Sequence, residues 1–440
     1  MKQIIIVYTT LLLLLLTQSA SAIDTSKLNA GDTAWVLVAA ALVLLMTPGV
    51  GFFYGGMVRK KNVLAIITQS FIIIALVSIQ WILVGYSLAF GPDIGGVIGG
   101  LDHVGLNGIG MGANPTYSET IPEYAFLIFQ AMFAIITPAL IIGSFADRMK
   151  FSSFLVFTLL WTTFIYDPLC HWVWGDGGWI RAMGALDFAG GTVVHISAGV
   201  SALAAALVLG RRVELSNGGE IKPHDITMVI LGASILWFGW FGFNAGSALA
   251  ANGLAAHAFV VTNTAAAAAA ISWMLVSWSR DKKPSSMGIV TGAVCGLVAI
   301  TPAAGFVSPL AAIVIGAIAG AVCFIMILFI KNKTRIDDAL DVMACHGMGG
   351  IIGALLTGVF ASTMINPGGA DGFMAGNPHL LLVQAASVLV TMIYAFTSTI
   401  VIMKVIDLIM GLRVRREEEI IGLDLTQHGE EAYPDMDLPA

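Results

Sequence analysis

Two histidines stand inside long apolar stretches, where an ionisable side chain is expensive. His195 lies in 186–210, "LDFAGGTVVHISAGVSALAAALVLG", and His346 lies in 337–358, "DDALDVMACHGMGGIIGALLTG". An imidazole can donate and accept hydrogen bonds and can exchange a proton near neutral pH. In a segment long enough to cross a membrane, such a residue marks a solute or proton pathway by default.

Each histidine follows an aspartate at the same spacing. Asp187 precedes His195 by eight residues, and Asp338 precedes His346 by eight. Eight helical residues rise about 12 Å, which carries each imidazole from a boundary toward the middle of a ~30 Å hydrocarbon core. The two spans are five apart and therefore cross in opposite directions. This pattern indicates two inverted repeats with a functional site between them, as in many transporters.

The composition indicates an integral membrane protein. The chain has 440 residues, of which 58% are hydrophobic and 11% charged, and its mean hydropathy is +0.89. We expect an all-α fold of eleven transmembrane helices, arranged as two five-helix repeats plus a final helix. The predicted spans are 33–56, 62–90, 124–146, 152–173, 187–210, 225–248, 256–279, 286–303, 308–330, 338–361 and 380–410.

The two ends of the chain differ from this eleven-span domain, 23–410. Residues 1–22 combine Lys2, a short apolar run and a terminal Ala-Ser-Ala, which is typical of a cleaved signal peptide; an uncleaved anchor is the alternative. Residues 411–440 form a polar tail with basic and acidic blocks. Such a tail is either disordered or an interaction segment.

Basic residues fix the expected orientation. They gather on alternate connections, as in 59–61, 211–212 and 331–335, whereas the opposite connections hold only Arg181 and Lys27. The positive-inside rule therefore places the N-terminus outside and the tail in the cytoplasm. The outer loop 91–123 is acidic and could attract cations, although an ordinary solvated loop explains it equally well.

The sequence gives no sign of metal or cofactor chemistry. The four cysteines, Cys170, Cys295, Cys323 and Cys345, have no metal-ligand or disulfide spacing, and we interpret them as small core residues. A membrane metalloenzyme using His and Asp ligands is the rival hypothesis, but it lacks an HExxH or comparable motif. We therefore predict no enzyme, no cofactor and no bound metal. The net charge of −6 gives no indication of nucleic-acid binding.

Several motifs resemble those of ammonium transporters of the Amt/Mep/Rh family, in the bacterial and archaeal Amt branch. They are "GALDFAGGTVVHISAG" (184–199), "WFGFNAGSA" (240–248), "FQAMFAIITPALI" (129–141), "DDALDVMACHGMGG" (337–350) and "GLDLTQHGEEAY" (422–433). The likeness covers the mature chain in order and spacing. It implies a homotrimer in the cell inner membrane, in which every subunit has its own pore.

The resemblance also implies roles for individual residues. It implies that ammonium, or its analogue methylammonium, is recruited at an outer site formed by Phe133, Trp174 and Ser247. Phe133 and Phe243 correspond to a gate of stacked rings below that site.

The remaining implied positions lie deeper in the protein. His195 and His346 correspond to paired pore imidazoles, and Asp187 to a carboxylate near the recruitment site. From the residues themselves, Asp187 is at least equally well explained as the N-cap of its helix. The resemblance further suggests that the tail is an ordered latch coupling subunits, and that a PII-type regulatory protein docks at the cytoplasmic face.

Desolvation decides between passage of the ion and passage of ammonia. Moving an ammonium-sized ion into a medium of dielectric ~4 costs on the order of 20 kcal/mol before relaxation. A cation–π contact returns only about 0.5–2 kcal/mol per ring. We therefore expect ammonium to lose its proton near the gate and ammonia to pass the histidines. Ammonia uniport and ammonia with a separate proton relay both remain open, and an ammonium sensor is the alternative function.

Overall fold

The computed structural model describes residues 25–433, so the predicted signal peptide and residues 434–440 lie outside the described residues. In the described part, ten helices are long and apolar enough to cross a membrane. The eighth predicted span is the exception, because its apolar helix, Ser286–Ile300, has only 15 residues and rises about 22 Å. The all-α membrane fold is thus confirmed, while length alone supports ten of the eleven spans.

The helices share the bundle with two small hairpins in the loop before residue 123. The helices before residue 211 are α2 (Ala30–Met57), α3 (Val63–Gln80), α4 (Tyr86–Phe90), α5 (Glu123–Phe145), α6 (Phe151–Trp161), α7 (Asp167–Trp174), α8 (Trp179–Ala182) and α9 (Ser197–Leu209). The later helices are α10 (Val213–Ser216), α11 (Ile226–Gly246), α12 (Gly253–Asp281), α13 (Ser286–Ile300), α14 (Pro309–Lys333), α15 (Met348–Phe360), α16 (Pro378–Met410) and α17 (Arg416–Ile421). The antiparallel hairpins pair β1 (Asp93–Ile94) with β2 (Ile98–Gly99), and β3 (Ala113–Asn114) with β4 (Ser118–Pro122).

Both histidine-bearing helices begin with a π-helical turn. These turns are Gly191–Ile196, which leads into α9, and Met343–Gly347, which leads into α15. The predicted span starts at 187 and 338 were therefore four to five residues too early. The preceding aspartates lie outside the helices and accept hydrogen bonds from their first N–H groups. Single π turns within α-helices occur frequently at functional sites.

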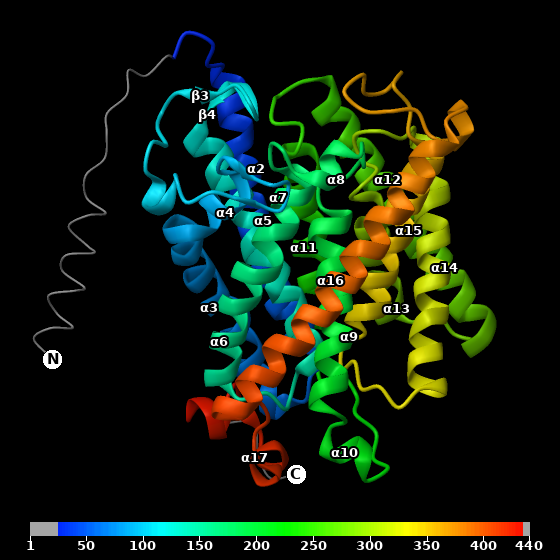
Figure 1. Ribbon diagram of the computed structural model, residues 1–440. Helices are drawn as coiled ribbons and strands as arrows, with labels where there is room; N and C mark the ends of the chain where they lie inside the picture. Colours follow the sequence, from blue (N-terminus) through cyan, green and yellow to red (C-terminus); the bar gives the residue numbers. More distant parts are fainter. Residues whose placement is uncertain (1–24, 434–440) are drawn as a thin grey trace, which may run out of the picture.

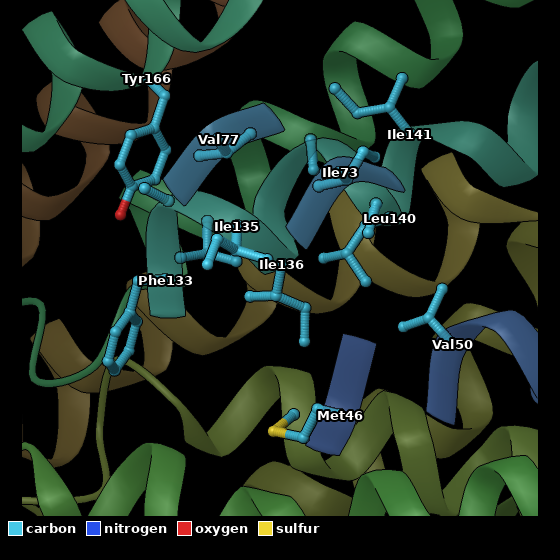
Figure 2. Close-up of a cluster of buried hydrophobic side chains, with 14 of the residues drawn as sticks. Met46, Val50, Ile73, Val77, Phe133, Ile135, Ile136, Leu140, Ile141 and Tyr166 are labelled. Atoms are coloured by element: carbon cyan, nitrogen blue, oxygen red, sulfur yellow. The ribbon is translucent and has the colours of Figure 1, made fainter. Parts of the chain in front are cut away.

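The core is built around α5. Almost every residue of α5 is buried, and its apolar side chains meet Met46 and Val50 of α2 and Ile73 of α3 (Figure 2). Helix α11 packs closely along α2. A Cβ added at Gly232 of α11 would lie only 2.2 Å from the backbone nitrogen of Phe53 in α2, so the glycine is what allows the two backbones to approach. This packing holds Phe133 of α5 and Phe243 of α11 in the interior of the bundle.

One end of the bundle, which we call the basic end, carries α10, α17 and the basic connections, while α8 and the β3–β4 hairpin lie at the other (Figure 1). At the basic end, Arg212 follows α9 and Asp337 precedes α15. Their side chains form an ion pair with Nη2 and Oδ1 2.9 Å apart. The end of one histidine helix therefore meets the start of the other, so the two helices run in opposite directions, as the inverted repeat predicts.

This ion pair belongs to a buried network. Arg148, Arg212 and Asp337 are at most 6% exposed, and Asp147 joins them through Arg212, with Nη1 and Oδ2 3.3 Å apart. Arg59 also pairs with Asp147, through Nε at 3.3 Å. Burial alone would raise the pKa of Asp337, but hydrogen bonds and charge from Arg212, together with the charge of Arg148, hold it below its ordinary value. The network ties the two repeats together at the basic end.

The described part of the tail, residues 411–433, packs on this end. Its Asp424 accepts hydrogen bonds from the backbone nitrogens of Leu64 and Ala65, at 3.0 and 2.8 Å. The Leu423 N–H donates to Oδ1 of Asn62 at 2.8 Å. The tail therefore caps the start of α3 from the same chain.

Replacing Asp337 by Ala should destabilise the protein strongly. It would leave the buried Arg148 guanidinium without its carboxylate and Arg212 with Asp147 alone, and breaking a buried ion pair typically costs about 3–5 kcal/mol. We expect a clear fall in the melting temperature of purified protein in detergent. Lys222→Ala is the control, because the Lys222–Glu220 pair is 74% and 76% exposed and should contribute little. Equal melting temperatures for Asp337→Ala and wild type would show that the network contributes nothing to stability.

Candidate functional site

The two histidines predicted from the sequence lie side by side in the interior. His195 and His346 are 1% and 4% exposed. Their Nδ1 atoms are 3.4 Å apart, and their rings are nearly stacked, with centroids 5.4 Å apart and an interplanar angle of 28°. The structure thus brings together two residues that are 151 positions apart in the chain.

A pair of neutral imidazoles in this geometry presents one donor and one acceptor. The two Nδ1 atoms can share a hydrogen bond only if one of them carries the proton, so the partner ring must carry its own proton on Nε2. Nε2 of His195 is buried and bonds to no other group in residues 25–433. It is therefore available to a small polar solute, as a donor in one tautomer and as an acceptor in the other.

Two glycines let the histidine helices approach this closely. A Cβ added at Gly199 of α9 would lie 2.1 Å from the backbone nitrogen of Gly347, the residue after His346. Any larger residue at position 199 would push the helices apart. The crossing point therefore sets the distance between the two imidazoles.

Asp187 caps the first of these helices with its whole carboxylate. Oδ1 accepts from the N–H groups of Gly190 and Gly191, at 2.8 and 2.6 Å. Oδ2 accepts from Thr192 and Val193, at 2.7 and 3.2 Å. Because four donors use both oxygens, the contacts favour the N-cap interpretation over direct contact with a solute.

The equivalent Asp338 is only partly satisfied. Oδ2 accepts from the Met343 N–H at 2.7 Å, whereas Oδ1 is buried and has no hydrogen-bond partner among the described residues. Burial raises the pKa of Asp338 to about 7, and the negative charge of Asp341 adds to the rise. Both repeats therefore have a capping aspartate, but only Asp187 has hydrogen bonds to both of its carboxylate oxygens. The sequence spacing gave no indication of this difference.

The histidines line a very small apolar cavity. Its volume is about 10 Å³, comparable to the space that one water needs. The rings of Trp240 and Phe243 lie 5.4 and 5.9 Å from that of His195. The other lining residues are apolar apart from the hydroxyl of Tyr54, which donates to Leu140 O at 2.9 Å. No Asp, Glu, Lys or Arg lines this cavity.

A larger cavity of about 250 Å³ lies on the outer side of the phenylalanine pair, away from the basic end. Phe133, Trp174 and Ser247 all line it, so the structure brings the three predicted recruitment residues together. The rings of Phe133 and Trp174 meet edge to face, with centroids 5.7 Å apart. Ser247 Oγ donates to Phe243 O at 2.9 Å, which leaves its lone pairs free to accept a hydrogen bond.

The predicted gate residues separate these two cavities. Phe133 lines the outer cavity and Phe243 the inner one, and their ring centroids are 4.4 Å apart. On the basic side, His346 also lines a third cavity of about 170 Å³, together with Asp341 and Lys331. The three cavities therefore follow one another across the bundle, interrupted by the phenylalanine pair and by the histidines.

Sequence reasoning missed one polar residue of the outer cavity. Gln130 of α5 lines it, and its Oε1 is buried without a hydrogen-bond partner in the described chain. Gln130 lies within the quoted stretch 129–141, but its spacing to other polar residues carried no signal. Its unpaired amide oxygen would be a further acceptor for a cationic donor if the side chain turned toward the cavity.

The cysteines and the metal-ligating residue types can be located in the described part of the chain. All four cysteines are buried and free, as expected for small core residues. Within residues 25–433, no group of three or more His, Cys, Asp or Glu side chains could hold a metal ion. The ligand set that the metalloenzyme hypothesis needs is therefore not found in the described chain.

Comparison with known proteins gives matches over most of the chain. A sequence model described as Ammonium Transporter Family matches residues 34–433. The ammonium transporter of Bacillus subtilis (strain 168) is 52% identical to this chain, covering 92% of it and 99% of the relative. The crystal structure of Candida albicans Mep2 aligns with a TM-score of 0.86 and 36% identity, over 95% of this chain and 93% of that one. A sensor Amt protein aligns with a TM-score of 0.83 and 32% identity, over 90% and 98%.

Replacing Asp187 by Ala should lower stability, because four N–H groups at a buried helix start would lose their acceptors. Each unsatisfied buried donor costs about 1–3 kcal/mol. Asp187→Asn should be intermediate, since its amide oxygen still accepts. Thermal unfolding in detergent measures both, and Asp176→Ala, an exposed aspartate of the same end, is the control. If Asp187→Ala melts like wild type but does not transport, the carboxylate acts on the solute and not on the fold.

Proposed function

The chain belongs to the ammonium transporter family, and from that premise we propose that it carries ammonium across the membrane as ammonia, through the three cavities in sequence. It is a multi-pass membrane transporter and not an enzyme. The proposal concerns the route: recruitment of the cation outside, loss of a proton at the phenylalanine pair, and passage of the uncharged amine along the histidines.

The size and lining of the central cavity support this route most directly. A space of about 10 Å³ without a charged side chain cannot hold an ion together with its hydration shell. Stripping that shell costs on the order of 20 kcal/mol in a medium of dielectric ~4, before relaxation. Ammonia is neutral and is the size of a water molecule, so it avoids this penalty.

The outer cavity has the chemistry needed to hold the cation before it is deprotonated. Ammonium has four N–H donors and a compact charge. The faces of Phe133 and Trp174 offer cation–π attraction, and Ser247 Oγ offers an acceptor. The site is open to outer water, so recruitment does not need full desolvation.

The phenylalanine pair acts as the gate. With centroids 4.4 Å apart, the rings of Phe133 and Phe243 leave no open path between the outer and central cavities. Rotation of the side chains would open the path briefly for a small solute. Ammonium entering this constriction gives up one proton, and the lone pair of the resulting ammonia can then accept a hydrogen bond.

The imidazole pair would then hold ammonia in an otherwise apolar passage. One ring offers a donor and the other an acceptor, and ammonia can use both. The proton released outside either stays in the outer water or moves separately along the Nδ1–Nδ1 bond of His195 and His346. These alternatives differ in net charge: the first moves none, and the second moves one positive charge per ammonia.

The cellular setting follows the same family premise. We place the protein in the cell inner membrane as a homotrimer, with its N-terminus outside and its tail in the cytoplasm. The positive charge of the basic end supports this orientation. The ordered tail supports a latch role, and the basic end is where a PII-type regulator would dock.

A sensor function is the alternative, because a sensor Amt protein has a similar fold. A protein kept only to report ammonium would tolerate a blocked pore. The three cavities that follow one another across the bundle argue instead for conduction, and a variant without the histidines distinguishes the two functions.

The double variant His195→Leu/His346→Leu should conduct ammonium at least tenfold less than wild type, because leucines offer no hydrogen bond to ammonia in the passage. Current or uptake in proteoliposomes measures this, and His257→Gln is the matched control, since His257 lies on α12, hydrogen-bonds to Val307 O at 2.9 Å and does not line the histidine cavity. Wild-type rates in the folded double variant would exclude an essential role for the imidazoles.

A single His195→Asp change should instead admit potassium, because the added carboxylate would attract the ion into the passage.

Trp174→Leu should raise the KM for methylammonium by roughly 2- to 30-fold, the equivalent of losing about 0.5–2 kcal/mol of cation–π attraction. The maximal rate should change little, because the passage itself is unaltered. Radiolabelled methylammonium uptake measures both quantities, and Trp278→Leu, at an exposed site on α12, is the control. An unchanged KM would remove Trp174 from the recruitment site.

A further inference from the structure

Gln384 on α16 is a buried amide that does not line the histidine cavity. It is 1% exposed, and all of its hydrogen bonds go to backbone groups. Its Oε1 accepts from the Leu186 N–H at 2.7 Å, and its Nε2 donates to Leu186 O at 2.8 Å. Nε2 also donates to Ala354 O of α15 at 3.0 Å. One side chain thus holds both backbone groups of a single loop residue.

Leu186 directly precedes the residue that organises the outer cavity. Asp187 caps the histidine helix with its carboxylate, and its backbone carbonyl accepts a hydrogen bond from Trp174 Nε1 at 2.9 Å. The orientation of the indole therefore depends on the direction of that carbonyl. Two hydrogen bonds separate Gln384 from the Trp174 ring, through Leu186 and Asp187.

We propose that Gln384 is a positioning residue for cation recruitment, acting through the Leu186–Asp187 backbone on the Trp174 indole. This inference rests on the proposed function, because it assigns Gln384 to the site where ammonium is recruited. The paired hydrogen bonds fix the Leu186 backbone against rotation, as a neighbouring strand would. These bonds fix the peptide groups on both sides of Leu186. The Asp187 carbonyl belongs to the next peptide group, and it keeps its direction toward the Trp174 indole relative to this fixed backbone.

The chemistry of the position fits glutamine closely. The loop needs one acceptor and two donors, which a primary amide supplies and a carboxylate does not. The stem is also confined, because a Cβ added at Gly358 of α15 would lie 3.1 Å from Cγ of Gln384. The amide therefore has little freedom to move, and its position determines that of the Leu186 backbone.

The loop has a second support that should preserve its fold without Gln384. The Phe188 N–H donates to Pro302 O at 3.1 Å, and the Asp187 cap is unaffected. Loss of the amide should therefore give the Trp174 indole more orientational freedom without unfolding the start of the histidine helix. This separates a positioning role from a purely structural one.

The test compares KM and kcat for radiolabelled methylammonium uptake into proteoliposomes. Gln384→Leu should raise KM by about 2- to 30-fold, no more than Trp174→Leu does, and leave kcat within about twofold. Gln384→Glu should raise KM less, because it keeps the acceptor for the Leu186 N–H. The double variant Gln384→Leu/Trp174→Leu should be no worse than Trp174→Leu alone, since both changes act through one ring.

Thr391→Val is the matched control. Thr391 lies on α16, is fully buried, and its Oγ1 has no hydrogen-bond partner among the described residues, so the change alters the helix without touching the loop. An unchanged KM in Gln384→Leu, or an equal fall of kcat in both α16 variants, would overturn the positioning role while leaving the recruitment site intact. An unchanged KM in Trp174→Leu would instead overturn the recruitment site itself, and this inference with it. If Gln384→Leu does not fold, the test uses Gln384→Glu alone. A raised KM in that variant supports the positioning role, and an unchanged KM overturns it.

Discussion

The high free-energy cost of dehydrating a cation is the constraint on which this structure depends. The central cavity holds about one water-sized solute and offers no charged side chain. In the proposed route, ammonium therefore passes this cavity only after it has lost a proton and become ammonia. We therefore assign cation binding to the outer cavity, which water reaches, and hydrogen bonding to the neutral amine to His195 and His346, on the other side of the phenylalanine pair.

The helices deliver this arrangement through a few local devices. Asp187 and Asp338 each cap the π turn that begins a histidine helix. Two facing glycines, Gly199 and Gly347, let the two helices cross closely. A buried ion-pair network holds the two repeats at the basic end. At the outer end, Gln384 holds the backbone of Leu186, and the carbonyl of the next residue, Asp187, accepts a hydrogen bond from the Trp174 indole. Stability and function thus share the same residues, because the elements that position the site also close the bundle.

The histidine pair and the inverted repeat could be predicted from the sequence. The eight-residue spacing from Asp to His appears twice, and the two spans are five apart, so they cross the membrane in opposite directions. The starts of those helices were wrong by four to five residues, because hydropathy does not distinguish a capping aspartate from the helix it caps. The unsatisfied oxygen of Asp338, the Gln130 acceptor and the Gln384 bonds could not be predicted. Each depends on contacts between distant segments, and a single polar residue in an apolar span gives no indication of its partner. The short eighth helix, Ser286–Ile300, was likewise hidden by the apolar residues that continue beyond it.

The central claim is that a permanently charged ion of similar size cannot follow ammonium through the passage. The most direct measurement compares the flux of radiolabelled rubidium with that of radiolabelled methylammonium into proteoliposomes containing the wild-type protein, each against empty liposomes. Rubidium carries the same charge but has no proton to release. The account predicts methylammonium uptake well above background and rubidium flux equal to that of empty liposomes. Rubidium flux approaching that of methylammonium would contradict it, because an ion would then cross the histidine pair with its charge.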